Sequence, residues 1–164
     1  MKSPELTFTE VRSLFTYTAA TGALAWRVQL SRRVRVGDAA GKITTNGYRR
    51  VRINGLDYQV HRLVWLYVHG RWPAAQIDHI DGDRLNNRSE NLREADASQN
   101  SFNTKSKPNA TGFKGVKLHR GKYEARIRFY NKTVYLGSFG SAQEAGQARA
   151  TAAIQYHGEF ARAA

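Results

Sequence analysis

The stretch that decides the fold occupies residues 77–93 and reads IDHIDGDRLNNRSENLR. It opens with a short apolar strand at 77–80 and continues in a loop rich in Asp, Asn and Gly, after which residues 92–93 can form a return strand. Asp96 then caps a polar helix that runs through Asn100. The sequence therefore predicts a strand, a loop, a second strand and a helix in this order.

Side chains in this stretch have the chemistry that phosphodiester cleavage needs. The reaction requires a base that activates water, a cation that stabilises the developing charge, and groups that hold both in place. Asp78 offers an oxygen ligand beside His79, a base, and Asn100 offers a second oxygen ligand. The amide of Asn91 could hold the imidazole of His79 in one tautomer.

Each of these residues by itself also has a structural explanation. A lone His79 would more often be an ordinary loop histidine, and Asn91 alone would most often be a cap. The remaining polar residues of the loop are expected to be turn formers, namely Asp81, Asp83, Asn86 and Asn87. The combination of residue types at this spacing favours a nuclease-type site.

Residues 46–103 resemble the HNH family of endonucleases, in the subgroup found in phages and mobile introns whose first motif is Asp-His. The resemblance rests on the motif at 77–93, on Ser98-Gln99-Asn100 at 98–100, and on the upstream sequence HRLVW at 61–65. An Asp-His pair alone would carry little weight, whereas the combined spacing is specific.

The resemblance implies a role for each candidate residue. His79 would be the general base, Asp78 and Asn100 would bind one divalent metal ion, and Asn91 would orient His79. Many HNH enzymes have a histidine where this chain has Asn100. An oxygen ligand there favours Mg²⁺ over zinc, with Mn²⁺ as the alternative. No small-molecule cofactor is expected.

Local signals predict further elements before the motif. A capping box at 7–10 opens a helix that carries Val11, Leu14 and Phe15 on its apolar side. A strand at 24–28 and a basic loop at 31–41 follow, and then a strand at 48–53 between the turns Asn46-Gly47 and Asn54-Gly55. A buried helix at 61–68 ends at Gly70. Arg49, Arg50 and Arg52 on the strand are candidates for DNA contact. Arg62 could steady a phosphate. A local packing role for His61 and Arg62 at the helix start is an equal alternative.

The C-terminal part predicts three short strands, at 115–119, 123–130 and 133–137, followed by a helix with a capping box at 141–144. In the middle strand, apolar and charged side chains alternate, so that one face of the sheet becomes strongly basic. Small residues at helical spacing let the helix lie close against the apolar face.

This part resembles the AP2 domain over about residues 112–161. The resemblance is carried by YEARI at 123–127, LGSF at 136–139, an Ala-rich helix and GEFA at 158–161. The chain lacks the tryptophans that many plant AP2 domains place on the DNA face, so their target motif is not transferable. The expected DNA contacts are Lys117, His119, Lys122, Arg126 and Arg128, and the alternative is a solvated basic face.

Charge is unevenly distributed along the 164 residues, which carry a formal net charge of +13. Residues 1–72 and 101–164 are each strongly basic, whereas the segment 73–100 is acidic. Basic flanks suit a phosphate backbone, and an acidic island suits a divalent cation, although a solvated acidic loop is an equal reading. The absence of cysteine excludes disulfides and zinc–thiolate sites.

The sequence thus predicts an α+β protein with four parts. They are a basic N-terminal strand and helix region at 1–45, an HNH ββα-metal core at 46–103, a linker at 104–111, and an AP2-like three-stranded antiparallel sheet with one packed helix at 112–164. We expect an intracellular, cytoplasmic enzyme that cuts double-stranded DNA in a nicking or homing role, with no membrane partner and a monomer favoured. The alternatives are a non-catalytic, sequence-specific DNA-binding protein and a degenerate homing enzyme that binds without cutting.

Overall fold

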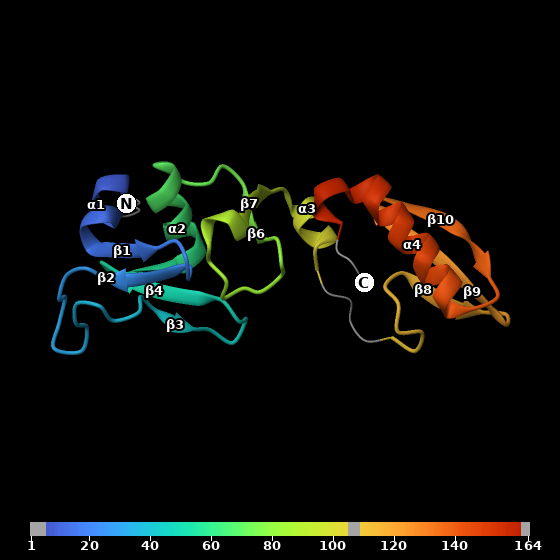
Figure 1. Ribbon diagram of the computed structural model, residues 1–164, viewed down its shortest axis with the longest axis horizontal. Coiled ribbons are helices and arrows are strands. Elements are labelled where there is room, and N and C mark those ends of the chain that lie inside the picture. Colours follow the sequence, from blue (N-terminus) through green and yellow to red (C-terminus); the bar gives the residue numbers. More distant parts are fainter. Residues whose placement is uncertain (1–5, 105–108, 162–164) are drawn as a thin grey trace. The chain divides into compact units, whose positions relative to one another are not determined.

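The computed structural model describes residues 6–104 and 109–161, and the chain forms two compact units, residues 1–94 and 95–164 (Figure 1). Both units combine helices with small antiparallel sheets, which confirms the predicted α+β class. No helix in the described parts of the chain is both long and apolar enough to cross a membrane.

From residue 6 onward, the described part of the first unit contains two α-helices and three small sheets. Its elements are α1 (Phe8–Leu14), β1 (Phe15–Thr18), β2 (Ala23–Trp26), β3 (Lys42–Ile43), β4 (Arg49–Ile53), β5 (Leu56–Gln59), α2 (Val60–His69), β6 (Gln76–His79), the 3₁₀ turn η1 (Ser89–Asn91) and β7 (Leu92–Ala95). Strand β1 pairs with β2, β4 lies between β3 and β5, and β6 pairs with β7. The last pair is the strand–loop–strand that residues 77–93 predict.

The predicted helix starts and stops of this unit are confirmed. Thr7 caps α1 and forms the full capping box with Glu10. Gly70 ends α2 in the left-handed conformation at φ 73°. One expectation was wrong, because Phe15 does not continue α1. Phe15 has extended backbone angles and opens β1, where its ring packs 4.5 Å from the ring of Trp26.

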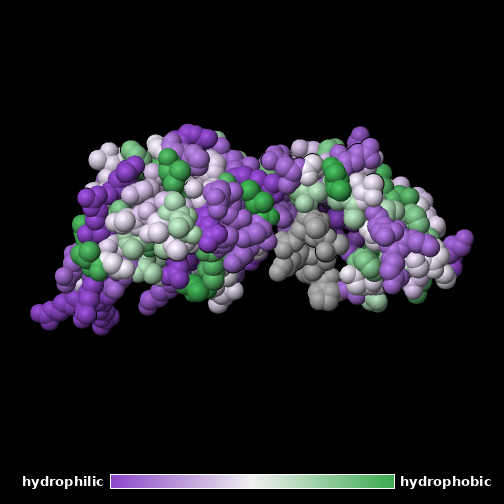
Figure 2. All heavy atoms as spheres, in the orientation of Figure 1, coloured by the Kyte–Doolittle hydropathy of each residue, from purple (hydrophilic) through white to green (hydrophobic). Residues whose placement is uncertain are grey.

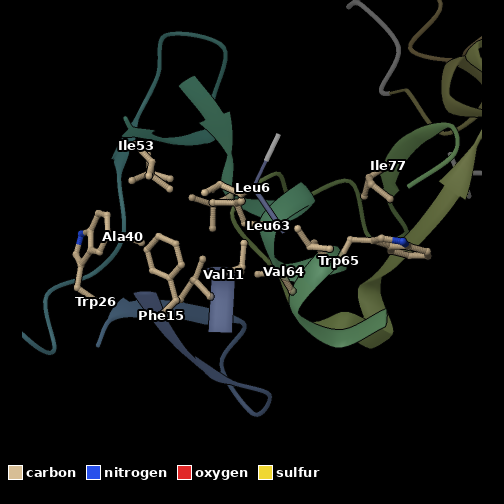
Figure 3. Packing of buried hydrophobic residues seen from close by; sticks show 14 of the residues in the cluster. Leu6, Val11, Phe15, Trp26, Ala40, Ile53, Leu63, Val64, Trp65 and Ile77 are labelled. Atoms are coloured by element: carbon tan, nitrogen blue, oxygen red, sulfur yellow. The ribbon is translucent and has the colours of Figure 1, made fainter. Parts of the chain in front are cut away.

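The core of the first unit surrounds α2, which is buried over most of its length (Figure 3). Leu63 and Val64 of α2 meet Val11 of α1, and Phe15 and Trp26 complete the cluster. Apolar packing in this cluster holds the N-terminal end of α2 and the end of β6 in place. The loop between β2 and β3 extends away from this core as a hydrophilic projection (Figure 2).

In its described residues, 95–104 and 109–161, the second unit contains two α-helices and one sheet. Its elements are α3 (Ala97–Phe102), β8 (Val116–His119), β9 (Lys122–Phe129), β10 (Lys132–Phe139), α4 (Ala142–His157) and the 3₁₀ turn η2 (Gly158–Phe160). The sheet is antiparallel in the order β10-β9-β8, and α4 packs against it. Alternation along β9 buries Ala125 and Ile127 and exposes Arg126 and Arg128, as predicted.

The boundary between the two units falls before α3, whereas the sequence grouped α3 with residues 46–103. The reason is the ring of Phe102, which stacks on His157 at 3.9 Å between centroids and packs with Phe129 and Phe160. Asp96 caps α3 in a capping box with Gln99. Residues 105–108 of the predicted linker lie outside the described residues.

Candidate active site

Asp78 and His79 end strand β6, and each is only 4% exposed. The carboxylate of Asp78 accepts two hydrogen bonds from Arg93 on β7, from Nε at 2.9 Å and from Nη2 at 2.7 Å. Two donors on one rigid guanidinium fix the carboxylate in one orientation. Sequence analysis did not anticipate this pair, although Arg93 belongs to the motif.

The imidazole of His79 is held by Asn87 from the loop between the two strands. Nε2 of His79 lies 3.0 Å from Oδ1 of Asn87, and Asn87 is itself buried. Because an amide oxygen only accepts, Nε2 carries the hydrogen in this contact, which leaves the lone pair of the neutral ring on Nδ1. This arrangement sets the tautomer that a base needs.

The loop contact to His79 therefore comes from Asn87, which was expected to be a turn former, and not from Asn91. The side chain of Asn91 is engaged elsewhere: Oδ1 accepts from the backbone of Asp81 at 3.0 Å, and Nδ2 donates to Asp81 Oδ1 and to the carbonyl of Asn86. Asn91 thus closes the loop on itself. A role of Asn91 in orienting His79 stays a prediction.

Asp81 is the centre of this loop and has the turn-forming role that the sequence predicted. Burial alone would raise the pKa of Asp81, but hydrogen bonds from Asn86, the backbone of Asp83 and Asn91 together lower it. An ionised carboxylate with several donors is a strong organiser of a polar loop. The loop therefore keeps its shape without apolar packing of its own.

The hairpin of β1 and β2 supports the same loop from the other side. The hydroxyl of Tyr17 donates to the carbonyl of Asn87 at 3.2 Å and accepts from the backbone of Ser89 at 2.8 Å. Gly22 has φ 71°, and a Cβ there would collide with the backbone of Asn87 and Arg88. The N-terminal region thus contributes to the position of Asn87.

The rings of His61 and Tyr48 lie beside the imidazole of His79. The ring of His61, at the start of α2, lies 5.1 Å from the ring of His79 in an edge-on arrangement, and Tyr48 lies 5.2 Å from His61. Burial lowers the pKa of His61 to about 3, with further contributions from His79 and Arg62. His61 is therefore neutral at neutral pH and adds no charge to the site.

Arg62 has the local contacts that were its alternative explanation. Its guanidinium lies 5.8 Å from the ring of Trp72 and donates to the carbonyl of Ala75 at 3.4 Å. A phosphate contact by Arg62 stays a prediction. Arg84 instead lies near the site, with its guanidinium 4.8 Å from the ring of Tyr48 and a hydrogen bond to the carbonyl of Asn46.

The remaining predicted ligand, Asn100, is half-buried on α3 of the second unit. Its pairing with Asp78 stays a prediction. In the described ranges, no group of three or more His, Cys, Asp or Glu side chains could hold a metal ion. One carboxylate and one amide oxygen nevertheless fit Mg²⁺, which keeps several waters and takes further oxygens from substrate phosphates.

The first unit also carries a basic groove beside strands β3 and β4, of about 680 Å³. Its basic lining residues are Arg33, Lys42, Arg50 and Arg52. Arg50 is paired with Asp57 at 3.7 Å. Arg49 lies on the opposite face of β4 and donates to the carbonyl of Gly41 at 3.0 Å. The groove therefore includes two of the three arginines that the sequence singled out.

The predicted basic face of the second unit is present and contains one acidic residue at its centre. Lys117, His119, Lys122, Arg126 and Arg128 are all exposed. Glu124, only 16% exposed, accepts from His119 at 2.9 Å and from Arg126 at 3.0 Å. The hydrogen bond from His119 is the main reason that the pKa of Glu124 is lowered, with a further contribution from Arg126. The face is thus less positive than its lysines and arginines suggest.

Comparison with known proteins finds similarity in the segment that carries this candidate site. Residues 58–102 match the model of a family described as HNH endonuclease. This segment is similar to HNH endonucleases. The match covers α2, β6, β7 and α3, and therefore includes His61, Asp78, His79, Asn87 and Asn100.

Two curated relatives agree with the family match. An uncharacterized HNH endonuclease of Acanthamoeba polyphaga mimivirus is 33% identical over 105 residues, which is 63% of this chain and 55% of that protein. Protein 3.8 of Escherichia phage T7 is 45% identical over 58 residues, 34% of this chain and 48% of that protein. The chain spans about half the length of these relatives. No solved structure matches. Together the family match and the mimivirus relative support a nuclease enzyme.

Proposed function

We propose that the protein is a metal-dependent endonuclease that hydrolyses phosphodiester bonds in double-stranded DNA, in a nicking or homing role. The observation that carries the proposal is the buried His79, whose Nε2 is held by Asn87 beside the oriented carboxylate of Asp78, within a segment similar to HNH endonucleases. Phosphodiester hydrolysis is supported by the fixed tautomer of His79, by the neighbouring carboxylate and by the sequence match.

His79 acts as the general base in this proposal. Nδ1 accepts a proton from water while Asn87 accepts the hydrogen of Nε2 and stabilises the imidazolium that forms. The water oxygen attacks phosphorus, and the 3′ oxygen leaves. Asp78 and Asn100 would hold one divalent ion, Mg²⁺ best and Mn²⁺ as an alternative, which supplies stabilisation of the charge that develops on the phosphate and the leaving oxygen.

DNA is bound in this proposal by the two basic surfaces. The groove beside β3 and β4 offers Arg50 and Arg52, and the face of β8 and β9 offers Lys117, Arg126 and Arg128. Cations that neutralise phosphates give affinity that falls with salt. The described residues carry one candidate site, so the elementary reaction in this proposal is a cut in one strand.

A plasmid-nicking assay tests the proposal. Wild-type protein should convert supercoiled plasmid to the open-circular form with Mg²⁺ or Mn²⁺ and should be inactive in excess EDTA. His79→Ala should lose about 10²- to 10⁴-fold in rate with DNA affinity nearly unchanged, because a general base acts in the transition state. His69→Ala is the matched control, since His69 packs on Trp65 outside the site. Equal activity of His79→Ala and wild type would refute the assignment.

The alternative function is a non-catalytic DNA-binding protein that uses the basic face of the second unit. The exposed cations of β8 and β9 favour it. The same assay separates the two: binding to duplex DNA without cutting at any metal concentration would support the alternative.

A further inference from the structure

The second unit contains a cavity of about 390 Å³ next to helix α4. Strand β8 pairs with β9 only from Lys122 to Ala125, so the later residues of β9 are not paired with β8, and the cavity lies beside them. Ile127 of β9 and Arg149 and His157 of α4 line the cavity. It shares Arg126 and Arg128 with the predicted DNA face, whereas Lys117, His119 and Lys122 of that face do not line it.

Arg149 is an uncompensated cation in this cavity. It is only 5% exposed, and within the described residues it has no hydrogen-bond or ion-pair partner. Its Nε is fully buried without an acceptor. Burial lowers the pKa of Arg149, but an arginine still keeps its charge. An unpaired buried charge is costly to folding, and proteins that retain one normally pair it with a ligand or ion.

The described residues that line the cavity with Arg149 include further basic side chains. The basic residues that line the cavity are Lys114, Arg126, Arg128 and Arg149, with His157 beside them, and the described lining includes no Asp or Glu. The ammonium of Lys114 is held by the carbonyls of Phe102 and Thr104, at 3.1 and 2.7 Å. These two contacts hold the ammonium at the edge of the cavity.

His157 has one polar atom without a partner in the described structure. Nε2 of His157 is 2.8 Å from the carbonyl of Arg128, whereas Nδ1 is buried and has no partner. Burial and the charges of Arg149 and Lys114 act to lower the pKa of His157. Since Nε2 donates to a carbonyl, Nδ1 of the neutral ring is an acceptor, and the buried donor that lacks an acceptor among the described residues is Nε of Arg149.

We propose that this cavity binds a phosphate group, with the buried guanidinium of Arg149 as its principal ligand and Lys114 as a second cation. A planar guanidinium binds phosphate oxygens in pairs, and a phosphate carries the negative charge that the lining lacks. The phosphate can belong to a DNA backbone or be a free inorganic anion. Only the first source rests on the proposed function.

The first arm of the test uses inorganic phosphate and the full chain. Thermal unfolding is followed by far-UV circular dichroism in phosphate and in chloride at equal ionic strength. The midpoint of the wild type should rise with phosphate concentration, because a ligand of the folded state stabilises it. Arg149→Met keeps most of the side-chain volume and should lose this rise. Lys132→Met, which removes an exposed cation at the start of β10, should keep it.

A second readout guards against a variant that fails to fold. Arg149→Met should unfold at the same or a higher temperature than wild type in chloride, because it removes an unpaired buried charge. In the wild type, the ring resonances of His157 should shift on addition of phosphate, and in Arg149→Met they should not. An equal phosphate effect on wild type and Arg149→Met would show only general salt stabilisation and would overturn the proposal.

The second arm identifies the source of the phosphate. Binding to a short duplex is measured at several salt concentrations without metal, so cutting is not involved. Loss of one backbone contact in Arg149→Met should reduce the slope of log affinity against log salt by about 0.9. A change in this slope assigns the cavity to DNA, and a phosphate effect without it assigns the cavity to a free anion. If neither arm responds to Arg149→Met, the cavity is not a phosphate site, whatever the nicking assay shows.

Discussion

The buried ion pair between Asp78 and Arg93 makes a quantitative prediction about stability. Their side chains are 6% and 13% exposed, and their closest contact is 2.7 Å. Unit charges about 4 Å apart at an effective dielectric constant of about 20 attract by about 4 kcal/mol. Removing Arg93 takes the hydrogen bonds of its Nε and Nη2, and the ion pair, away from a buried carboxylate. We therefore expect Arg93→Met to lower the free energy of unfolding of the first unit by about 3 to 5 kcal/mol.

Tryptophan fluorescence during urea unfolding is the appropriate assay. All three tryptophans, Trp26, Trp65 and Trp72, lie in the first unit, so the signal reports this unit alone. The double variant Asp78→Asn/Arg93→Met should lose less stability than the sum of the two single variants, because it removes both charges together.

An exposed ion pair in the same unit provides the control. Arg71 donates to Glu94 at 2.8 Å but is 56% exposed, so Arg71→Met should cost much less than Arg93→Met. If Arg93→Met lowers the free energy of unfolding by less than about 1 kcal/mol, the Asp78–Arg93 pair behaves like a solvated surface pair. The argument that Arg93 fixes the carboxylate of Asp78 would then be refuted.

Further predictions concern the loop, the buried histidine and the basic face. Asn87→Ala should reduce the nicking rate about 10- to 100-fold with unchanged DNA affinity, whereas Asn91→Ala should mainly destabilise the first unit; a rate unaffected by Asn87→Ala would contradict the tautomer assignment. Burial lowers the pKa of His61 from 6.5 to about 3, so as pH falls the imidazole of His61 is protonated in the unfolded chain at a higher pH than in the folded chain. Stability should fall as pH drops from about 6.5 to about 3, and His61→Gln should reduce that slope in urea unfolding at several pH values. Glu124→Gln should raise duplex affinity at low salt by releasing His119 and Arg126, and an unchanged dissociation constant would mean that this face does not meet DNA.

The sequence by itself determined the elements whose signals are local. Capping boxes depend on side chains three residues apart, so Thr7 with Glu10 and Ser141 with Glu144 could be recognised without a structure. The turn at Asn54-Gly55 needs positive φ at both positions, and both residues have it. Alternation along β9 likewise fixed which side chains are buried. The adjacent pair Asp78 and His79 could be predicted as a candidate site because its neighbours in the chain complete a pattern that resembles HNH endonucleases.

Contacts between distant residues were decided only by the tertiary structure. Asn87 and Asn91 are alike in chemistry, and the folded loop alone determines that Asn87 contacts His79 while Asn91 contacts Asp81. Phe15 belongs to β1 and not to α1, because strand pairing with β2 and packing on Trp26 stabilise it more than a continued helix would.

The grouping of α3 and the unpaired charge of Arg149 have the same origin. Helix α3 belongs with the second unit because Phe102 stacks on His157, 55 residues away in the chain. In sequence, Arg149 is an ordinary charged residue of a helix, and only the packing of α4 on the sheet buries it without a partner among the described residues. Local spacing determines secondary structure, but burial and charge pairing depend on which distant surfaces meet, and hydrophobic packing decides that only in the folded chain.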